Sequence, residues 1–177
     1  SEKTGTVNLM AVAKGVLNEA NGTVDNPVVI FRATPALKSN AHYGSRIVFD
    51  KDGNMFVSTG ERSILEGRVQ AQDLASGLGK IFKITKEGKP APGNPFIGKA
   101  GAMPEIYSYG NRNVQSLAIH PVTGDLWECE FGPRGGDELN IIKAGKNYGW
   151  PIITYGTDDS ITVNGIVTLQ ATDFIFS

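Results

Sequence analysis

The sequence predicts an all-β chain built from repeated antiparallel units, and three observations favour this class. Short runs of β-branched and aromatic residues alternate with turns, and no long stretch has the apolar period of a helix. The 22 glycines and 9 prolines favour turns. One unit also occurs twice: IVFDKDGNMFVSTGE aligns with LAIHPVTGDLWECEFG, at an offset of about 70 positions. Such repeats are typical of β-propeller blades, and a β-sandwich with two similar hairpins is the alternative.

The first expected strands precede the repeat. Val7–Val12 is predicted to be a strand, because its apolar spacing is closer to two residues than to 3.6. Gly15 and Asn18 also interrupt any helix at this point. A loop over 18–27 then leads to a β-branched and aromatic strand over 28–34.

The two repeated units come next, and each is a hairpin followed by one more strand and a Lys-x-Gly turn. The expected hairpins span 46–60 and 116–132, and the strands after them span 79–90 and 137–149. Insertions over 62–78 and 89–104 lengthen the first unit. At roughly 45 residues per blade, the chain covers about three to four blades. The sequence therefore predicts a single partial β-propeller domain over 1–177.

The bulk composition excludes several classes of protein. A net charge of -1 gives no attraction to nucleic acid or to an anionic membrane. No apolar run reaches the roughly 18 to 20 residues of a membrane-spanning helix. Cys129 is the only cysteine, so no disulfide can form within the chain. With 40% hydrophobic residues, the chain is long enough to bury a core.

The two histidines differ in their sequence context. His42 lies in NAHYGSR, just before a strand, and an imidazole can accept a proton near neutral pH. The alternative is a loop histidine that contacts only solvent. His120 opens a hairpin turn and is predicted to be an exposed turn residue.

The segment YGNRNVQS places Arg112 between two asparagines at the entry to a strand. The guanidinium group offers a fixed fork of donors for an anion, and Asn113 adds an amide. In the alternative reading Arg112 pairs with a nearby acid such as Glu105.

The stretch from Glu130 to Pro151 combines many turns with many oxygen atoms, which suits calcium. Asp137 and Glu138 supply carboxylates, and the turns supply carbonyl groups. The sequence contains no EF-hand loop, zinc cluster, phosphate-binding loop or Gly-x-Ser-x-Gly elbow.

Several segments, in their order and spacing, resemble the glucose/sorbosone dehydrogenase family. They are HYGSRIVFDKDGNMFVSTGE, AQDLASGLGKIFKI, GNPF and EIYSYGNRNVQSLAIHPVTGDLWECEFGPRGGDELNIIKAGKNYGWP, and the match runs from about Val28 to Gly156. The resemblance implies a six-bladed β-propeller that carries pyrroloquinoline quinone (PQQ) and calcium on one face. It implies an oxidoreductase that oxidises aldose sugars to lactones, passes electrons to an external acceptor and is periplasmic or secreted.

The resemblance also assigns roles to residues near the expected cofactor. His42 corresponds to the catalytic base, which takes the proton of the anomeric hydroxyl group. Arg112 and Asn113 correspond to a pair that contacts PQQ. Glu61 stands beside this site, where many relatives have Asp.

Two further pairs correspond to calcium ligands. Gly132 and Pro133 match a corner whose carbonyl groups hold the calcium beside PQQ. Glu138 and the main-chain carbonyl of Tyr148 match a second calcium site.

One segment departs from the family pattern. After NYGWPIITYG the family usually has a Tyr-Ser-Gly-like segment that helps to hold the cofactor, whereas this chain reads TDDSITVNG, and 168–177 matches nothing. This departure and Glu61 favour the alternative function, a non-enzymatic calcium-stabilised β-propeller binding module. Because an open arc of blades exposes apolar faces, we expect that the chain either self-associates through its open edges or is a fragment of a longer protein, and that alone it has little or no sugar dehydrogenase activity.

Overall fold

The computed structural model describes residues 2–4 and 6–153, and strands dominate this part of the chain. The strands are β1 (Glu2–Thr4), β2 (Val7–Asn18), β3 (Thr23–Leu37), β4 (Gly44–Phe49), β5 (Met55–Thr59), β6 (Lys80–Ile84), β7 (Ile106–Tyr109), β8 (Val114–Ile119), β9 (Leu126–Glu130) and β10 (Glu138–Ile142). A four-residue helix α1 (Leu65–Arg68) continues into a 3-10 turn η1 (Val69–Gln72). The predicted all-β class is therefore confirmed.

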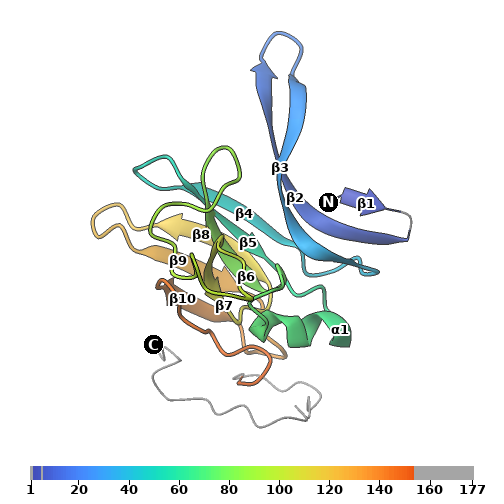
Figure 1. Cartoon of the computed structure of the whole chain (residues 1–177), viewed down its shortest axis with the longest axis vertical. Coiled ribbons are helices and arrows are strands. Elements are labelled where there is room, and N and C mark those ends of the chain that lie inside the picture. The colour runs from blue at the N-terminus through green and yellow to red at the C-terminus, as the bar shows by residue number, and fades with distance from the viewer. Residues whose placement is uncertain (1, 5, 154–177) are drawn as a thin grey trace.

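The strands form three antiparallel sheets, which are arranged around the body of the molecule (Figure 1). The sheet orders are β1-β2-β3, β4-β5-β6-β7 and β8-β9-β10. The four-stranded sheet is a complete blade, and the next sheet repeats its first three strands. The fold is thus part of a β-propeller, as predicted, and the sheets of the described residues do not close into a ring.

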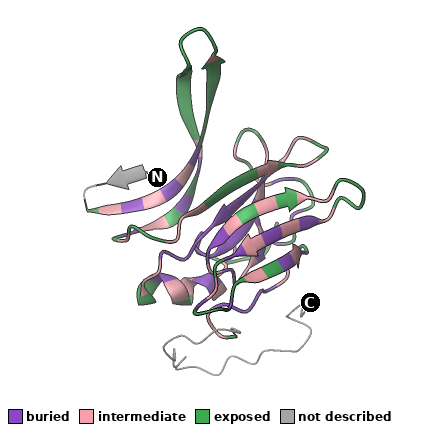
Figure 2. Cartoon of the chain, turned by 180° about the vertical axis from the view of Figure 1, so that it is seen from behind, coloured by how far each residue is buried: buried purple, intermediate pink, exposed green. Residues whose placement is uncertain are grey.

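The four-stranded sheet is the middle layer, and its inner strands β5 and β6 are buried on both faces, whereas β4 is largely exposed (Figure 2). One face packs against β2 and β3 in a cluster that includes Val12, Phe31, Val57 and Phe82. The other face packs against β8–β10 in a second cluster that includes Phe56 and Leu126. All five residues of β5 are buried, which explains why MFVST reads as a continuous run and not as an alternating one.

The hairpin of β2 and β3 is much longer than the sequence predicted. The expected loop over 18–27 is wrong: β2 runs on to Asn18, and β3 begins at Thr23. The register shifts between Lys14 and Val16, and this bulge lets the strand pairing continue past Pro27, which has no amide hydrogen to donate. The far half of the hairpin projects away from the body as an arm (Figure 1).

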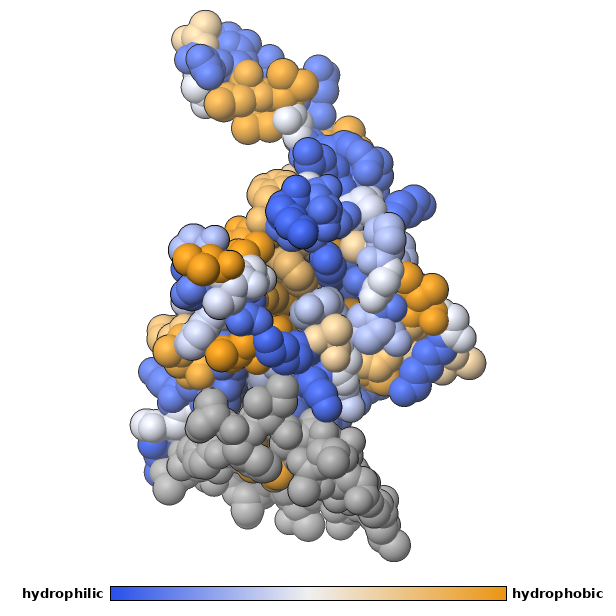
Figure 3. Space-filling view, turned by 90° about the vertical axis from the view of Figure 1, so that its left-hand side faces the viewer, coloured by the Kyte–Doolittle hydropathy of each residue, from blue (hydrophilic) through white to orange (hydrophobic). Residues whose placement is uncertain are grey.

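The arm carries apolar side chains that no other part of the described chain covers. Val16, Leu17, Val24 and Val28 are each more than half exposed. Figure 3 shows hydrophobic side chains gathered on this arm and on the side of the body. An apolar hollow of 660 Å³ lies between β2 and β3 on one side and Ile47, Phe49 and Met55 on the other.

Four elements were not expected from the sequence, namely β1, β7, α1 and η1. β7 completes the first blade by pairing with β6, and it falls where no strand was predicted. The insertion over 62–78 contains α1 and η1. Among the described residues, no helix is long and apolar enough to cross a membrane.

The two ends of the blades carry different residues. We call the end where β4 and β8 begin, and where β5 and β9 end, the site end. We call the opposite end, which carries the hairpin turns over 50–54 and 120–125, the turn end. β4 and β8 are neighbours, so the site ends of the two blades lie side by side.

Candidate active site

His42 is held at the site end by a buried carboxylate. Its Nδ1 lies 2.5 Å from Oε1 of Glu61, whose side chain is fully buried. The other oxygen of Glu61 accepts a hydrogen bond from the backbone N–H of Ser63. Because Glu61 can only accept at Nδ1, neutral His42 carries its proton there, and Nε2 keeps the lone pair that a base needs.

The backbone around His42 requires close contacts. His42 has a left-handed φ of 47°, and its carbonyl oxygen accepts a hydrogen bond from the N–H of Arg62. A Cβ atom at Gly60 would lie 2.3 Å from that same carbonyl oxygen, so this position needs glycine. The turn after β5 therefore presses directly against the loop that carries His42.

Arg112 and Asn113 lie beside this loop, at the start of β8. The N–H of Glu61 donates to the carbonyl oxygen of Arg112, and the N–H of Gly44 donates to Oδ1 of Asn113. Oδ1 of Asn113 also accepts from Gln115. The carbonyl oxygen of the Asn113 side chain is thus engaged within the fold, and it ties the two blades together.

The guanidinium group of Arg112 reaches the end of β9. Its Nη1 donates to the carbonyl oxygens of Phe131 and Gly132, at 2.8 and 3.1 Å, and its planar group lies 5.0 Å from the ring of Trp150. Its Nε is buried and has no hydrogen-bond partner among residues 2–153 that the structure describes.

The Gly132-Pro133 corner forms a tight turn. A Cβ atom at Gly132 would lie 1.7 Å from the carbonyl oxygen of Gly136, so only glycine fits. The carbonyl oxygen of Pro133 accepts a hydrogen bond from Gly136, and that of Gly132 accepts from Arg112. Both carbonyl groups that were predicted to hold a calcium ion already have a donor here.

Glu138 belongs to a group of carboxylates that the sequence analysis did not identify. β9 and β10 pair Glu130 with Glu138 and Glu128 with Asn140, so all four side chains share one face. Glu128 and Glu130 are almost fully buried. Nδ2 of Asn140 donates to Glu128 at 2.7 Å and to Glu138 at 3.1 Å.

Burial makes these carboxylates hard to ionise. Burial raises the pKa of Glu128 to about 8. It also raises the pKa of Glu130 well above its ordinary value, and the neighbouring Glu128 and Glu138 add to the effect. Oε2 of Glu128 is buried without a hydrogen-bond partner in the described part of the chain. A cation placed among these carboxylates would favour their ionised forms.

Tyr148 contributes only its main chain to any nearby ligand. Its hydroxyl group donates to the carbonyl oxygen of Ile141 and accepts from the N–H of Lys143. Both partners lie at the opposite end of β10 from Glu138. No group of three or more His, Cys, Asp or Glu side chains within 2–4 and 6–153 has the arrangement of a metal site.

The residues that sequence reasoning missed share one signal. Glu128 and Glu130 alternate along LWECE, at positions where the first blade has Val57 and Thr59. The presence of two acidic residues on the buried face of a repeat that is otherwise apolar would have identified Glu128 and Glu130 as candidate site residues.

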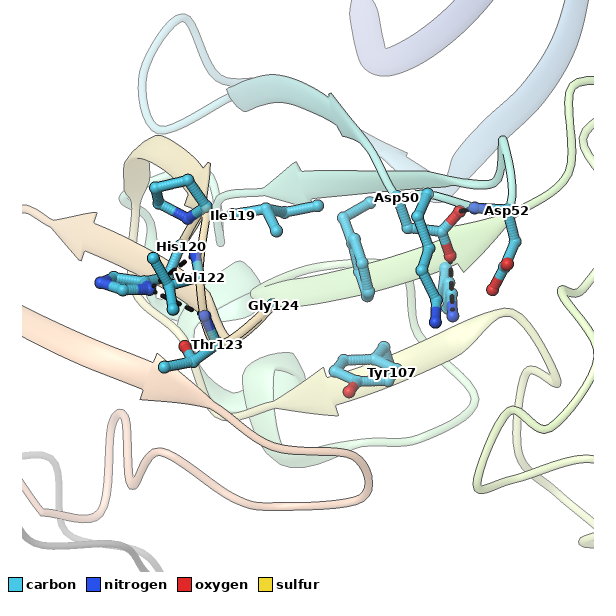
Figure 4. Close-up of a pocket in the computed structure, with 12 residues that line it drawn as sticks. Asp50, Asp52, Tyr107, Ile119, His120, Val122, Thr123 and Gly124 are labelled. Carbon is cyan, nitrogen blue, oxygen red and sulfur yellow. Dashed lines mark hydrogen bonds and ion pairs between the residues drawn. The ribbon is translucent and has the colours of Figure 1, made fainter.

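The turn end holds a separate pocket of 590 Å³ that contains none of the predicted site residues. Figure 4 shows Asp50 and Asp52 on one side of it and the turn from His120 to Gly124 on the other. Nδ1 of His120 accepts hydrogen bonds from the N–H groups of Val122 and Thr123. His120 lies at the turn, as predicted, but it is partly buried and not exposed, and its side chain stabilises that turn.

The chain matches the family model described as Glucose / Sorbosone dehydrogenase over residues 1–171. It is 44% identical over 158 residues to the aldose sugar dehydrogenase YliI of Escherichia coli (strain K12), which covers 89% of this chain and 41% of that protein.

Solved structures agree with this match. The fold resembles that of a glucose dehydrogenase with a TM-score of 0.82 and 44% identity, over 88% of this chain and 44% of the other. It also resembles the PQQ-bound form of the aldose sugar dehydrogenase from Streptomyces coelicolor, with a TM-score of 0.69 and 38% identity, over 84% and 42% of the two chains.

The chain spans about two fifths of the length of these relatives. The family match extends beyond Val28–Gly156 at both ends and takes in most of the segment after 156, which lies outside the described residues. Since this match covers nearly the whole sequence and the fold agrees with it, the chain belongs to the glucose/sorbosone dehydrogenase family.

Proposed function

We propose that the protein that contains this chain oxidises aldose sugars at the anomeric carbon to lactones, with PQQ and calcium as cofactors. The observation that carries the proposal is the His42–Glu61 pair, which lies next to Arg112 at the site end of two adjacent blades. The relatives named above act on sugars or bind PQQ according to their names, which supports the same reaction here.

His42 acts as the base in this proposal. The proton of the anomeric hydroxyl group moves to Nε2 of His42, and the carbon–oxygen bond becomes the carbonyl of the lactone. Glu61 is a positioning residue, because it fixes the proton on Nδ1 and stabilises the imidazolium that forms. When bound, PQQ supplies the acceptor for the hydride that leaves the anomeric carbon, and an external acceptor then takes the electrons.

The residues near Arg112 fit an anionic, planar cofactor. The buried Nε of Arg112 has no partner in the described chain, so it is free to donate to a carboxylate or quinone oxygen of PQQ. The amide nitrogen of Asn113 could add a second donor, since its carbonyl oxygen is already engaged. Gly132 and Pro133 would shape the edge of this site through their tight turn.

The face of Glu128, Glu130 and Glu138 fits one calcium ion better than any neutral ligand. It offers carboxylate oxygens and the amide oxygen of Asn140, which are calcium ligands, and a cation would satisfy the unpartnered oxygen of Glu128. Because the carboxylates do not converge as a set of three, main-chain carbonyls such as that of Tyr148 and water would complete the coordination.

Replacement of His42 tests the enzymatic proposal. In the whole protein, reconstituted with PQQ and calcium, His42→Ala should lower kcat for aldose-dependent dye reduction by about 10² to 10⁴. PQQ binding, followed by absorbance, should be largely retained. His120→Ala is the matched control, because His120 lies at the turn end, and it should leave kcat unchanged. Near-normal turnover in His42→Ala would remove His42 from the mechanism.

The second candidate is a calcium-stabilised β-propeller that binds another molecule without redox chemistry. The engaged carbonyls of Gly132 and Pro133 favour it, because they leave fewer groups free for a cofactor metal. A whole protein that binds calcium but neither binds PQQ nor oxidises any aldose would support this candidate.

The remaining partners follow from the exposed surface. We propose that the chain alone associates through the arm and the apolar hollow beside β4, because soluble monomers rarely expose such surfaces. In the whole protein these faces would pack against further blades. We also propose that the whole protein lies in the periplasm or outside the cell, as the family resemblance implies. Light scattering on the isolated chain tests the association, and a stable monomer would contradict it.

A further inference from the structure

Arg62 is a buried cation whose contacts converge on the loop that carries His42. It is only 1% exposed, although an arginine is rarely fully buried unless its guanidinium group is paired. Nε of Arg62 donates to the carbonyl oxygen of Ala41 at 3.1 Å, and Nη2 donates to that of Ser39. These two carbonyl groups lie on the N-terminal side of His42.

The same guanidinium group anchors the loop to β2. Nη1 donates to the carbonyl oxygen of Asn8 at 3.0 Å, and Nη2 donates to the side-chain oxygen of Asn8 at 2.6 Å. The hydroxyl group of Tyr43 donates to that same Asn8 oxygen, and the ring of Tyr43 lies 4.0 Å from the guanidinium carbon. Residues on both sides of His42 are therefore fixed by one side chain.

The main chain of Arg62 completes the clamp. Its N–H donates to the carbonyl oxygen of His42, and its carbonyl oxygen accepts from the hydroxyl group of Ser39. Arg62 follows Glu61 directly, so consecutive residues hold the imidazole ring and the backbone that carries it. The loop over 38–43 has no strand or helix of its own to impose a geometry.

We propose that Arg62 is a positioning residue that holds His42 in line with Glu61, so that Nε2 faces the substrate with its lone pair. This inference rests on the proposed role of His42 as the base. The guanidinium group makes four hydrogen bonds from three separate nitrogens, to Ala41, to Ser39 and twice to Asn8, whereas the three donors of a lysine share one nitrogen and cannot span these four acceptors. Arg62→Lys should therefore keep the charge and lose the clamp.

The two histidines of the chain allow a direct test that needs neither cofactor nor sugar. Nδ1 of His42 faces a carboxylate that can only accept, whereas Nδ1 of His120 faces two backbone N–H groups that can only donate. The neutral rings must then be opposite tautomers. Nitrogen-15 shifts of the labelled rings, read by magic-angle-spinning NMR on the sedimented chain, report each tautomer whatever the oligomeric state.

In the unaltered chain, we expect His42 to be protonated only on Nδ1 and His120 only on Nε2. In Arg62→Lys, His42 should become a mixture of tautomers, while His120 stays unchanged and shows that the fold is intact. Arg46→Lys is the matched control, because the side chain of Arg46 donates to the carbonyl oxygen of Gln115 and takes no part in the hydrogen bonds of the clamp described above. It should leave both rings as they are.

A pure Nδ1–H tautomer of His42 in folded Arg62→Lys would overturn the proposal. If that variant fails to fold, which His120 would reveal, Asn8→Ala decides, because it removes only one acceptor of the clamp. We expect a partial tautomer mixture there, and an unchanged His42 would again overturn the proposal.

Kinetics on the whole protein give a second measurement. Arg62→Lys should lower kcat by about 10- to 100-fold, because a small displacement of the base is costly, while KM changes little. If the whole protein oxidises no aldose, the proposed function fails, but the tautomer result still stands on its own.

Discussion

The middle strands of the two repeated blades occupy the same place and carry opposite chemistry. Pairing within each hairpin makes Val57 of β5 equivalent to Glu128 of β9, and both face the preceding sheet. Val57 is fully buried among apolar side chains, whereas Glu128 is buried beside two further carboxylates. The repeat thus specifies the backbone, and the acids are additions to it.

The two blades also differ at the next strand, where the first blade contains a buried cation. The register of each pair makes Lys80 of β6 equivalent to Glu138 of β10. Lys80 is fully buried, and its ammonium group donates to the carbonyl oxygens of Gln70, Ala71 and Leu78, at 2.9, 3.0 and 2.6 Å. The second blade has acids and lacks such a cation, which is why we expect it to take calcium from solution.

The largest effect should come from placing an acid of the second blade into the first. Val57→Glu buries a carboxylate against Phe31 and Phe82, while the ammonium group of Lys80 is already engaged by three carbonyl oxygens, so the change should cost at least about 3 kcal/mol in the free energy of unfolding. Urea denaturation, compared with the unaltered chain at equal concentration, measures this loss.

Val57→Ala is the control for that experiment, since it removes volume without adding charge. It should cost about 2 kcal/mol, as expected for a small cavity. If Val57→Glu costs no more than Val57→Ala, the first blade tolerates a buried acid as well as the second blade does. The proposed difference between the two blades would then be wrong.

These buried charges also mark the limit of what the sequence could predict. The hairpins around 50–54 and 120–125 were found because apolar strands flank glycine turns. His42, Arg112 and Glu138 were predicted as site residues because they belong to motifs of the family that the sequence resembles. Glu61 was noticed only because many relatives have Asp at this position, and the sequence could not show that Glu61 contacts His42.

Other features depend on partners that are remote in the sequence. Arg62 and Glu128 are charged, and charged residues are expected on the surface unless a distant group satisfies them. β7 has only four residues, too few for a clear pattern. The long arm was missed because Asn18–Pro27 is polar and contains proline, and its exposed strands show no buried face.

An effect of intermediate size should appear in how the free energy of unfolding depends on pH, because of the buried Lys80 in the first blade. Burial lowers the pKa of Lys80 to about 7, from 10.5 in an unfolded chain. Between these values the unfolded chain binds more protons, so this group makes the free energy of unfolding rise with pH. The contribution is fully present above about 10.5 and is lost as the pH falls through about 7.

Lys80→Met isolates this contribution, because all other titrating groups are shared. From pH 7 to pH 9, the free energy of unfolding of the unaltered chain should rise relative to Lys80→Met by roughly 2 kcal/mol. Urea denaturation at several pH values gives the difference. Parallel pH profiles for the two chains would mean that Lys80 keeps an ordinary pKa when it is buried.

The smallest effect should come from giving the second blade the residue of the first, and its sign depends on calcium. Without calcium, Glu128→Val removes a buried carboxyl oxygen that has no partner, at the cost of one hydrogen bond from Asn140. The variant should gain about 1 kcal/mol, because an unsatisfied buried group costs more than a single hydrogen bond contributes. With calcium at about 100 times its Kd, the unaltered chain should gain about 2.7 kcal/mol that the variant lacks, so the order of stability reverses.

Thermal unfolding in chelator and in millimolar calcium measures the stability of both chains in both conditions. Glu66→Val, at an exposed site, controls for the loss of charge. An equal response of both chains to calcium would show that Glu128 does not bind the ion, and the acids of the second blade would then need another explanation.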